Sequence, residues 1–383
     1  MNLFDYDPRT RILFGPGQLS ALGQEAGALG CRRALVVSDP GVVSAGHAQQ
    51  AMTSLESAGL AIRLFDGVAE NPTAAHVERG VEVAREFEPD LLVGVGGGSS
   101  MDCAKGINFI YCCGGTMQDY WGVGKATSDL LPMIAVPTTA GTGSEAQSFT
   151  LISNEKSHVK MACGDKRAAC RLALLDPEVT LTQPPQVTAL TGIDAIAHAV
   201  ETFVTNKRTP ISLAFSREAW RLLSTSFPKV LDDPSDVIAR GGMQLGACFA
   251  GMAIENSMLG AAHALANPLT SRYDIPHGQA VGLMLPHVVR FNGEEVDPWY
   301  IELLEAGAHG NGAPLPSAGS QGVAAMLTEM FGRAGIPLQL GQCDVPQDVL
   351  PDLAKDAAKQ WTGGFNPRRV GENELLDLYV AAY

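Results

Sequence analysis

Apolar residues follow two different patterns along the 383-residue chain, and the change falls near its middle. In the first half, short continuous apolar runs alternate with segments of helical spacing. Continuous runs of this kind are typical of strands buried on both faces of a parallel sheet. We expect strands at 11–17, 34–39, 61–65, 91–95 and 133–137, and helices at about 19–29, 45–58 and 74–87. The alternation predicts α/β units with a mostly parallel sheet.

From about Pro184 the apolar runs stop and long helical patterns replace them. We expect helices at 188–204, 211–223, 238–257, 278–285, 322–333 and 372–382. This half is therefore predicted to be all-helical. The segment D-P-E-V-T-L-T-Q-P-P marks the change, and it predicts a domain boundary between residues 1–183 and residues 184–383.

Composition and charge narrow the classes of partner. The chain has 27 Lys and Arg against 41 Asp and Glu, a formal net charge of −14, which argues against a nucleic-acid surface because phosphates require clustered basic residues. The N-terminus has neither a basic nor an apolar segment, and the apolar stretch 246–267 contains Glu255, Asn256 and His263, which argues against a secretory signal and a membrane span. None of the eight cysteines has C-x-x-C spacing, which indicates reduced thiols rather than a disulfide framework or a zinc finger. We therefore expect a cytoplasmic globular protein with small-molecule partners.

Two loops rich in glycine and hydroxyl groups directly follow predicted strands. They are G-V-G-G-G-S-S-M-D at 94–102 and P-T-T-A-G-T-G-S-E at 137–145. Ligands of open α/β sheets bind at the carboxyl ends of strands, where glycines let backbone amides approach a pyrophosphate and a helix N-terminus favours negative charge. Tight turns use the same residues, but two such loops in one sheet favour a dinucleotide site. The usual G-x-G-x-x-G fingerprint is absent after the first strand, so we expect a variant site.

Asp39, at the end of the predicted strand 34–39, is a candidate for cofactor selectivity. A carboxylate at this place accepts both hydroxyls of an adenosine ribose and repels a 2′-phosphate, which favours NAD over NADP. An aspartate before Pro40 and Gly41 is equally consistent with a helix or turn cap. The spacing leaves both interpretations open.

Four residues of the second half have the side chains that a divalent transition metal prefers: Asp194, His198, His263 and His277. One carboxylate and three imidazoles suit Zn(II) and Fe(II) alike. Asp194 and His198 are spaced i, i+4 among small and apolar neighbours, so both face one side of a predicted buried helix. Each residue alone has an ordinary interpretation: a hydrogen-bonded pair, a core histidine or a helix cap. Because polar groups in apolar surroundings need partners, the four together favour one metal site.

Several stretches match one family together, although no single one would identify it. They are G-G-G-S-S-M-D-C-A-K (96–105), P-T-T-A-G-T-G-S-E (137–145), 174–201, H-A-L-A-N-P-L (263–269), 273–288 and N-P-R (366–368). On these stretches the chain resembles the iron-dependent (group III) alcohol dehydrogenase family over essentially its whole length. The resemblance implies an N-terminal NAD(P)-binding α/β domain and a C-terminal helical domain, with the active site in the cleft between them. It also implies a homodimer or a larger homo-oligomer.

The resemblance further implies which residues form the site. It places the metal on Asp194, His198, His263 and His277, with His277 near the nicotinamide, and it favours Fe(II) over Zn(II). It places the cofactor against one set of residues: Asp39, Asn71, Gly96, Gly97, Gly98, Ser99, Asp102, Thr138, Thr139, Thr142, Ser144 and Lys160. As a bare sequence feature, Lys160 is an ordinary surface lysine. No catalytic side chain beyond the metal site is expected.

Asn267 departs from the family pattern. Many members have a second histidine four residues after the third ligand, and this chain has Asn267 there. Asparagine forms hydrogen bonds but takes up no proton near neutral pH, which puts a proton relay through this position in doubt. We expect a contact with substrate at Asn267 instead. The relatives also suggest Phe149, Ile254 and Thr362 as residues that shape the substrate pocket.

These features predict reversible hydride transfer between NAD(H) and a small primary alcohol or aldehyde, or a diol or hydroxyaldehyde. A metal with an open position acts as a Lewis acid on the substrate oxygen, and the nicotinamide exchanges the hydride. The alternative is a lyase resembling dehydroquinate synthase, whose phosphorylated and carboxylated substrate needs many basic residues. Only Arg272 and Arg290 stand near the ligand motifs, which argues against this alternative. A metal-binding protein without turnover would leave the two glycine-rich loops unexplained.

Overall fold

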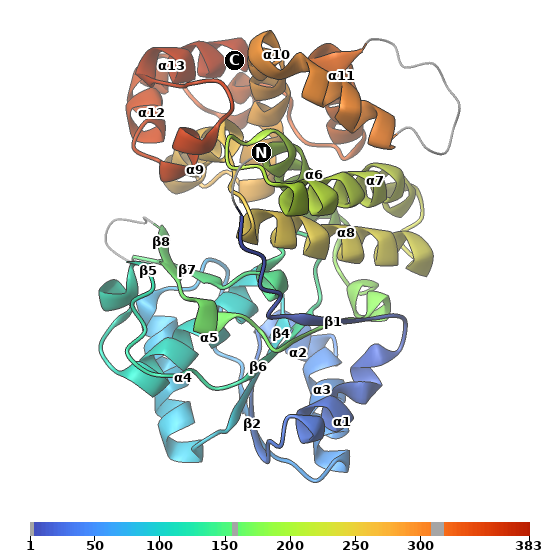
Figure 1. Cartoon of the computed structure of the whole chain (residues 1–383), viewed down its shortest axis with the longest axis vertical. Helices are drawn as coiled ribbons and strands as arrows, with labels where there is room; N and C mark the ends of the chain where they lie inside the picture. Colours follow the sequence, from blue (N-terminus) through green and yellow to red (C-terminus); the bar gives the residue numbers. More distant parts are fainter. Residues whose placement is uncertain (1–3, 155–159, 308–317) are drawn as a thin grey trace. The chain divides into compact units, whose positions relative to one another are not determined.

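The computed structural model describes residues 4–154, 160–307 and 318–383, and the chain divides into two compact units (Figure 1). The first, here named the α/β unit, consists of Asp7–Thr139 and Gly143–Gln183. The second, named the helical unit, consists of Pro184–Tyr383 together with the N-terminal residues to Tyr6 and the short segment Ala140–Thr142. Part of one predicted glycine-rich loop therefore belongs with the helices.

The α/β unit is built on a six-stranded sheet in which all neighbouring strands pair in parallel, in the order β1-β9-β6-β4-β2-β3. Its strands are β1 (Arg11–Phe14), β2 (Arg33–Val37), β3 (Ala61–Phe65), β4 (Leu91–Gly96), β6 (Met133–Pro137) and β9 (Leu172–Leu175). All residues of β4 and β6 are buried, which explains their continuous apolar sequence. The five strands predicted from the sequence all form. The pattern does not predict β9, because four apolar residues are too few to distinguish a strand from a helix.

Helices cover both faces of this sheet. They are α1 (Leu22–Ala28), α2 (Pro40–Ser44), α3 (His47–Ser57), α4 (Ala74–Phe87) and α5 (Gly98–Cys113), with 3-10 turns η1 (Gln18–Ala21), η2 (Met117–Tyr120), η3 (Ser144–Ala146), η4 (Lys166–Ala168) and η5 (Pro177–Thr180). Leu35 and Val37 of β2 belong to one apolar cluster with α4 and α5, whereas Ala34 and Val36 belong to another with α1 and α3. Because successive strand residues point to opposite faces, these two clusters lie on opposite sides of the sheet. The predicted α/β class is confirmed.

The strand order reverses between β2 and β4. From β2 the chain passes outward to β3 at one edge, and from β4 it passes through β6 to β9 in the other direction. Such a reversal opens a crevice at the carboxyl ends of the two central strands, where ligands of open α/β sheets bind. In this chain β2 leads directly into Ser38 and Asp39, and β4 ends at Gly96.

A second sheet of three strands lies in the same unit, and the sequence pattern does not predict it. Its strands are β5 (Gly122–Val123), β7 (Phe149–Ser153) and β8 (Lys160–Gly164), in the order β5-β8-β7. Lys105 of α5, only 1% exposed, holds the chain that leads into β7. Its Nζ donates hydrogen bonds to the carbonyl oxygens of Ser144, Gln147 and Phe149 at 2.7, 2.8 and 2.9 Å. These bonds replace the water that the ammonium group loses on burial.

The helical unit contains no strand among the residues that the structure describes, so its predicted class is confirmed there. Its helices are α6 (Pro185–Val204), α7 (Pro210–Asp232), α8 (Val237–Glu255), α9 (Ala261–Tyr273), α10 (His277–Gly307), α11 (Gly319–Arg333), α12 (Leu350–Ala357) and α13 (Glu372–Ala381), with 3-10 turns η6 (Leu340–Cys343), η7 (Gln347–Val349) and η8 (Trp361–Phe365). The central helix is α6, which packs against α7, α8 and α10 and is buried from Gly192 to Val204.

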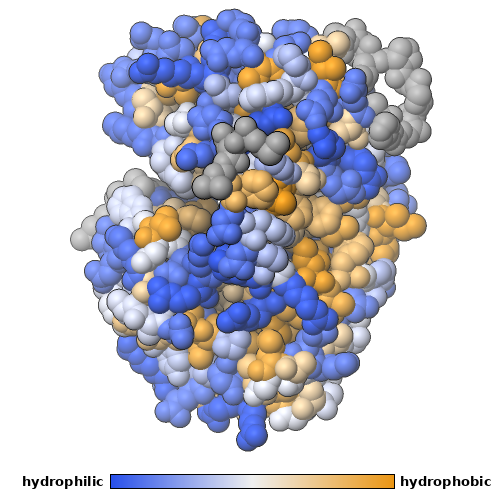
Figure 2. All heavy atoms as spheres, viewed as in Figure 1, coloured by the Kyte–Doolittle hydropathy of each residue, from blue (hydrophilic) through white to orange (hydrophobic). Residues whose placement is uncertain are grey.

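Two helices, α6 and α8, are long and apolar enough to cross a membrane by length and composition alone. Their most apolar windows are 83% and 67% buried inside the structure, and core helices of soluble proteins meet the same criteria. Figure 2 shows hydrophobic residues at the surface over α8 as well, where Ile238 is 88% exposed. Packing within the helical unit accounts for most of the apolar character of both helices.

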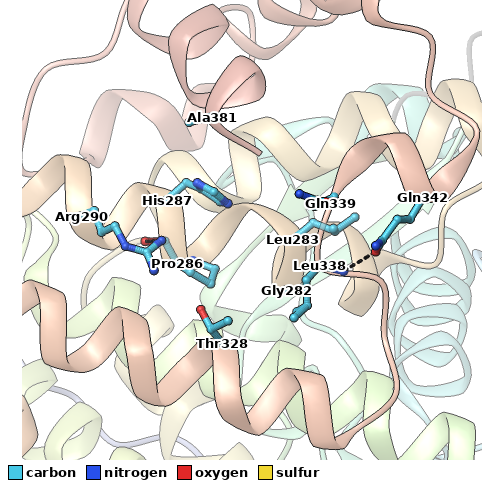
Figure 3. Close-up of a pocket in the computed structure, with 10 residues that line it drawn as sticks. All are labelled: Gly282, Leu283, Pro286, His287, Arg290, Thr328, Leu338, Gln339, Gln342 and Ala381. Carbon is cyan, nitrogen blue, oxygen red and sulfur yellow. Dashed lines mark hydrogen bonds between the residues drawn. The ribbon is translucent and has the colours of Figure 1, made fainter. Parts of the chain in front are cut away.

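A cavity of about 410 Å³ lies among α10, α11 and the chain that follows α11 (Figure 3). His287 and Arg290 of α10 line it together with Thr328, two glutamines (Gln339 and Gln342) and apolar residues. The His287 ring has no hydrogen-bond partner among the described residues. Burial, assisted by the positive charge of Arg290, lowers the pKa of His287 to about 4. This histidine is therefore neutral in the folded chain at neutral pH.

Replacing Lys105 with Met should destabilise the α/β unit. Methionine fills a similar volume but removes the ammonium donor from three buried or partly buried carbonyl oxygens, at an expected cost of about 3 kcal/mol. Urea unfolding followed by circular dichroism measures this as a lower midpoint. The control is Lys166→Met at an exposed site, which should move the midpoint very little. Equal midpoints for the two variants would contradict the structural role of Lys105.

His287 should make the chain less stable in acid. The folded pKa of about 4 lies below the value of about 6.5 expected in the unfolded chain, so between these values only the unfolded chain binds the proton. The contribution of this group to stability is present above pH 6.5 and is lost as pH falls towards 4. The melting temperature of His287→Gln should therefore fall less between pH 7.5 and pH 5 than that of the unchanged protein. Thr328→Val, in the same cavity, should keep the original pH dependence.

Candidate functional site

Asp39 lies at the reversal point of the sheet and is engaged by two neighbours. Its Oδ1 accepts a hydrogen bond from the backbone N–H of Val42 at 3.0 Å, so it caps α2. Its Oδ2 accepts one from the hydroxyl of Ser100 at 3.1 Å. The cap interpretation is thus confirmed, and it does not exclude the ribose interpretation. A carboxylate oxygen can accept a second hydrogen bond, and Asp39 is only partly buried, so both oxygens have capacity for a ribose hydroxyl.

The two glycine-rich loops meet at this point. Thr138 donates its backbone N–H to the carbonyl oxygen of Gly96 at 2.9 Å. A Cβ on Gly96, whose φ is 151°, would lie 2.4 Å from the Ser100 hydroxyl, and a Cβ on Gly97 would lie 3.3 Å from the Thr139 methyl group. Position 96 therefore requires glycine, and a side chain at position 97 would press against Thr139.

A helix begins directly at this backbone. Gly97 is the N-cap of α5, Gly98 is its first residue, and Ser99 follows, partly exposed. The first backbone N–H groups of a helix lack intrahelical partners and, with the helix dipole, favour an anion. The predicted residues Gly96 to Ser99, Thr138 and Thr139 are therefore brought together in a form that suits a phosphate group.

A charged cluster supports the same loops. The Ser144 hydroxyl donates to Asp102 Oδ1 at 2.8 Å and accepts from Lys105 Nζ at 3.0 Å. Burial raises the pKa of Asp102, while Lys105, Ser144 and the more distant Lys160 act in the opposite direction. Lys160 therefore lies within electrostatic reach of Asp102. Lys105 was not among the predicted site residues; its spacing of three from Asp102 on one helix is the signal that indicates it.

Asn71 and Thr142 are the two remaining residues of the predicted cofactor set, and their role stays a prediction. Asn71 is exposed in the loop after β3, with a φ of 51°, and Thr142 belongs to the helical unit. Of the residues suggested for the substrate pocket, Phe149 packs in β7 against Gly164, whereas Ile254 and Thr362 are buried in the helical unit. Contacts within one unit do not test whether these three residues shape a substrate pocket. They also do not test whether Asn71 and Thr142 bind a cofactor.

In the helical unit, the side chains of three histidines surround one carboxylate oxygen. His198 Nε2, His263 Nε2 and His277 Nε2 lie 3.3, 3.4 and 3.7 Å from Asp194 Oδ1. The His198 and His263 rings stack with centroids 4.9 Å apart, and the His277 ring lies 5.4 Å from that of His263. Helix α6 provides Asp194 and His198 one turn apart, α9 provides His263 in its first turn, and α10 begins at His277.

These distances fit the shell around a metal ion. Ligand atoms about 2.0–2.2 Å from a metal lie about 2.8–3.6 Å from one another in tetrahedral or octahedral geometry. Ligand atoms of Asp194, His263 and His277 all lie within 4.8 Å of one another. His198 is not part of this mutually close group, and its link to the group is the 3.3 Å approach of its Nε2 to Asp194 Oδ1. Asp194 Oδ1 and His263 Nε2 are buried without a hydrogen-bond partner, which is costly unless an ion satisfies them.

Burial and the neighbouring charges both shift the pKa values of the residues in this cluster. Burial opposes the ionisation of Asp194, but His198, His263 and His277 hold its pKa below the ordinary range. Burial lowers the pKa of His198 despite the nearby Asp194. For His263 burial acts in the same direction, yet Glu201 and Asp194 raise its pKa to about 9. A divalent cation would take the place of the proton that these carboxylates hold on His263.

Asn267 follows His263 by one turn on α9, and its Nδ2 donates to Gln360 Oε1 at 3.0 Å. The amide is thus oriented by another amide, and this pair contains no group that titrates near neutral pH. A residue that the sequence interpretation missed is Glu201, a buried carboxylate beside His263. Its spacing of seven from Asp194 places it on the same face of α6.

Comparison with known proteins identifies relatives over the whole chain. A family model described as iron-containing alcohol dehydrogenase matches residues 8–177, and a model of the C-terminal part of the Fe-containing alcohol dehydrogenase family matches residues 188–383. The 1,3-propanediol dehydrogenase of Citrobacter freundii is 34% identical over 384 residues, covering 100% of this chain and 99% of that protein.

Solved structures give the same result. A crystal structure of 1,3-propanediol oxidoreductase superposes with a TM-score of 0.94 at 32% identity and covers 100% of both chains. The sulfoacetaldehyde reductase of Bifidobacterium kashiwanohense, solved in complex with NAD+, superposes with a TM-score of 0.89 at 26% identity, covering 100% of this chain and 99% of that one.

Proposed function

Because the chain belongs to the iron-containing alcohol dehydrogenase family, we propose that it transfers hydride between NAD(H) and a small primary alcohol or aldehyde, or a diol or hydroxyaldehyde. Family membership makes it an oxidoreductase with a metal. The observation that carries the proposal is the convergence of three imidazole nitrogens on Asp194 Oδ1, at 3.3 to 3.7 Å. A diol is included because the relative from Citrobacter freundii is a 1,3-propanediol dehydrogenase.

Asp194, His198, His263 and His277 are proposed as the metal ligands, with Fe(II) as the ion. Zn(II) accepts the same donors, and the family alone favours iron. When bound, such an ion lowers the pKa of a substrate hydroxyl and polarises a substrate carbonyl. The side chains of Asp194, His198 and His263 are at most 8% exposed, whereas that of His277 is 28% exposed. Substrate is therefore proposed to approach the cluster on the side of His277, near the nicotinamide.

The reversal point of the sheet is proposed to hold NAD. The N-terminus of α5 would receive the pyrophosphate, and Asp39 would accept the adenosine ribose hydroxyls. Support comes from the contact of Asp39 with Ser100 and from the NAD+ complex of the related sulfoacetaldehyde reductase. Asp102, Ser144 and Lys160 would hold the loops around the cofactor, and Asn71 and Thr142 remain proposed contacts from the resemblance.

Asn267 is proposed to contact substrate through its amide. Its Nδ2 is oriented by a hydrogen bond to Gln360, and an amide cannot relay a proton. We further propose a cytoplasmic homo-oligomer, a dimer or larger, on the strength of the resemblance. A lyase acting on a phosphorylated substrate is not favoured. Arg272 pairs with Asp356, and Arg290 lines the cavity of Figure 3, which the four proposed ligands do not line.

The proposal predicts metal-dependent formation of NADH. Purified protein should be stripped with a chelator, reloaded anaerobically with Fe(II) or with Zn(II), and mixed with NAD and C2 to C5 alcohols and diols. NADH absorbance should rise only after reloading, and His277→Ala should lose most of this activity. If no alcohol or aldehyde is turned over in a metal-dependent way at substantial protein concentration, the dehydrogenase proposal is wrong.

Asp39→Asn should relax the preference for NAD. Asparagine keeps an oxygen for the Val42 N–H and so preserves the cap, while it removes the charge that repels a 2′-phosphate. The ratio of kcat/KM with NADP to that with NAD should rise by about tenfold, equivalent to about 1.4 kcal/mol. Asp129→Asn removes one exposed negative charge elsewhere and should leave the ratio unchanged. An unchanged ratio in Asp39→Asn would refute the assigned role.

A further inference from the structure

Glu201 completes a row of three acidic and imidazole side chains on α6. Asp194, His198 and Glu201 are spaced i, i+4 and i+7, so they share one face of the helix. Glu201 is only 3% exposed, and within the described part of the chain its ion-pair partner is His263. A buried carboxylate needs full compensation by hydrogen bonds, so its partners define what it does.

Both oxygens of Glu201 are used by the start of α9. Oε2 bonds to His263 Nδ1, and Oε1 accepts the backbone N–H of Ala262 at 2.7 Å. The preceding amide, that of Ala261, donates to Asn366 Oδ1 at 3.3 Å. A Cβ on Gly260 would lie 3.0 Å from that Asn366 oxygen and 3.1 Å from Glu201 Oε1. The helix therefore starts in a pocket of acceptors that fixes its first turn, including His263.

Asn366, from the N-P-R stretch, is itself held without a vacant hydrogen-bonding position. Its Nδ2 donates to Asn292 Oδ1 and to the Arg368 carbonyl oxygen, both at 2.7 Å, and its Oδ1 also accepts from Asn292 Nδ2 at 3.2 Å. Asn292 and Asn366 are 1% and 4% exposed. This support positions the backbone of α9, and among the described residues it forms no hydrogen bond with the imidazole of His263.

We propose that Glu201 is a positioning residue that selects the tautomer of His263, and this rests on the proposed metal site. A neutral imidazole has one N–H and one lone pair. When an ion displaces the extra proton of His263, Glu201 keeps the N–H on Nδ1, and the lone pair of Nε2, which lies 3.4 Å from Asp194 Oδ1, is left for the proposed metal. Glu201 thereby prepares His263 as a ligand through Nε2 without being a ligand itself.

Glutamine at this position would favour the opposite tautomer. Two donors, the Ala262 N–H and the His263 Nδ1–H, require two acceptors, and a glutamine side chain has only one acceptor oxygen. If that oxygen accepts the backbone N–H, the amide NH₂ faces Nδ1, which must then accept. The imidazole proton moves to Nε2 and blocks the metal position. Glu201→Gln should therefore weaken metal binding although it changes neither the size nor the shape of the side chain.

The test measures the Zn(II) dissociation constant of metal-free protein by competition with a chromogenic chelator, without any assay of turnover. Relative to the unchanged protein, Glu201→Gln should bind roughly 10–100-fold more weakly. Glu201→Asp, which keeps two acceptor oxygens, should recover part of the loss. Asn366→Ala loosens the same helix start without touching the imidazole, and it should bind Zn(II) more tightly than Glu201→Gln. Circular dichroism confirms that each variant is folded.

The outcomes separate the two proposals. Equal Zn(II) affinity in Glu201→Gln and in the unchanged protein, while His263→Ala loses the ion, overturns the role of Glu201 and leaves the metal site intact. An unchanged protein that takes up no Zn(II) overturns both. A second measurement needs no variant at position 201: ¹⁵N-histidine NMR of the Zn(II)-loaded protein, with His263 assigned by His263→Asn. A proton on Nδ1 is expected, and a proton on Nε2 overturns the proposal.

Discussion

The helical unit depends on one constraint: a carboxylate, Asp194, is only 6% exposed in the middle of the long apolar helix α6. A buried charge is tolerated only when opposite charge and hydrogen-bond donors surround it. The starts of two other helices provide this environment, since His263 lies in the first turn of α9 and α10 begins at His277. The start of α10 packs closely against α6, since a Cβ on Gly278 would lie 2.0 Å from the Leu190 carbonyl oxygen.

In the α/β unit, buried polar contacts support backbone amides that stay exposed to a ligand. Its ligand surface consists of backbone amides, which must be left uncovered and yet held in place. Glycines at 96 and 97 keep side chains away from these amides, and the contacts among Ser144, Asp102 and Lys105 fix the loops from behind. Rigid support beneath an open backbone is what allows weak, numerous hydrogen bonds to select a phosphate.

The sequence predicted those elements and site residues that leave a local periodic pattern or a family motif. Five parallel strands, the helices α6, α7, α8, α10, α11 and α13, and the cluster of Asp194 with three histidines follow from such patterns. The sequence did not predict helices α9 and α12. It did not predict β9 or the sheet of β5, β7 and β8, because pairing between distant short strands leaves no periodic signal. It also missed Lys105 and Glu201. A single charged residue in an apolar helix has the same sequence pattern whether it is buried with partners or turned to solvent, and only the fold distinguishes the two.

The proposed ligands come from three separate helices, and this has a consequence for the protein in the cell. An ion that joins α6, α9 and α10 acts as a non-covalent crosslink between segments distant in the sequence. Since the unfolded chain has no such arrangement, the folded state gains free energy with metal concentration, about 2.7 kcal/mol at one hundred times the dissociation constant. The supply of metal would then regulate how long the protein survives proteolysis as well as whether it is active, so that starvation for the ion lowers its abundance.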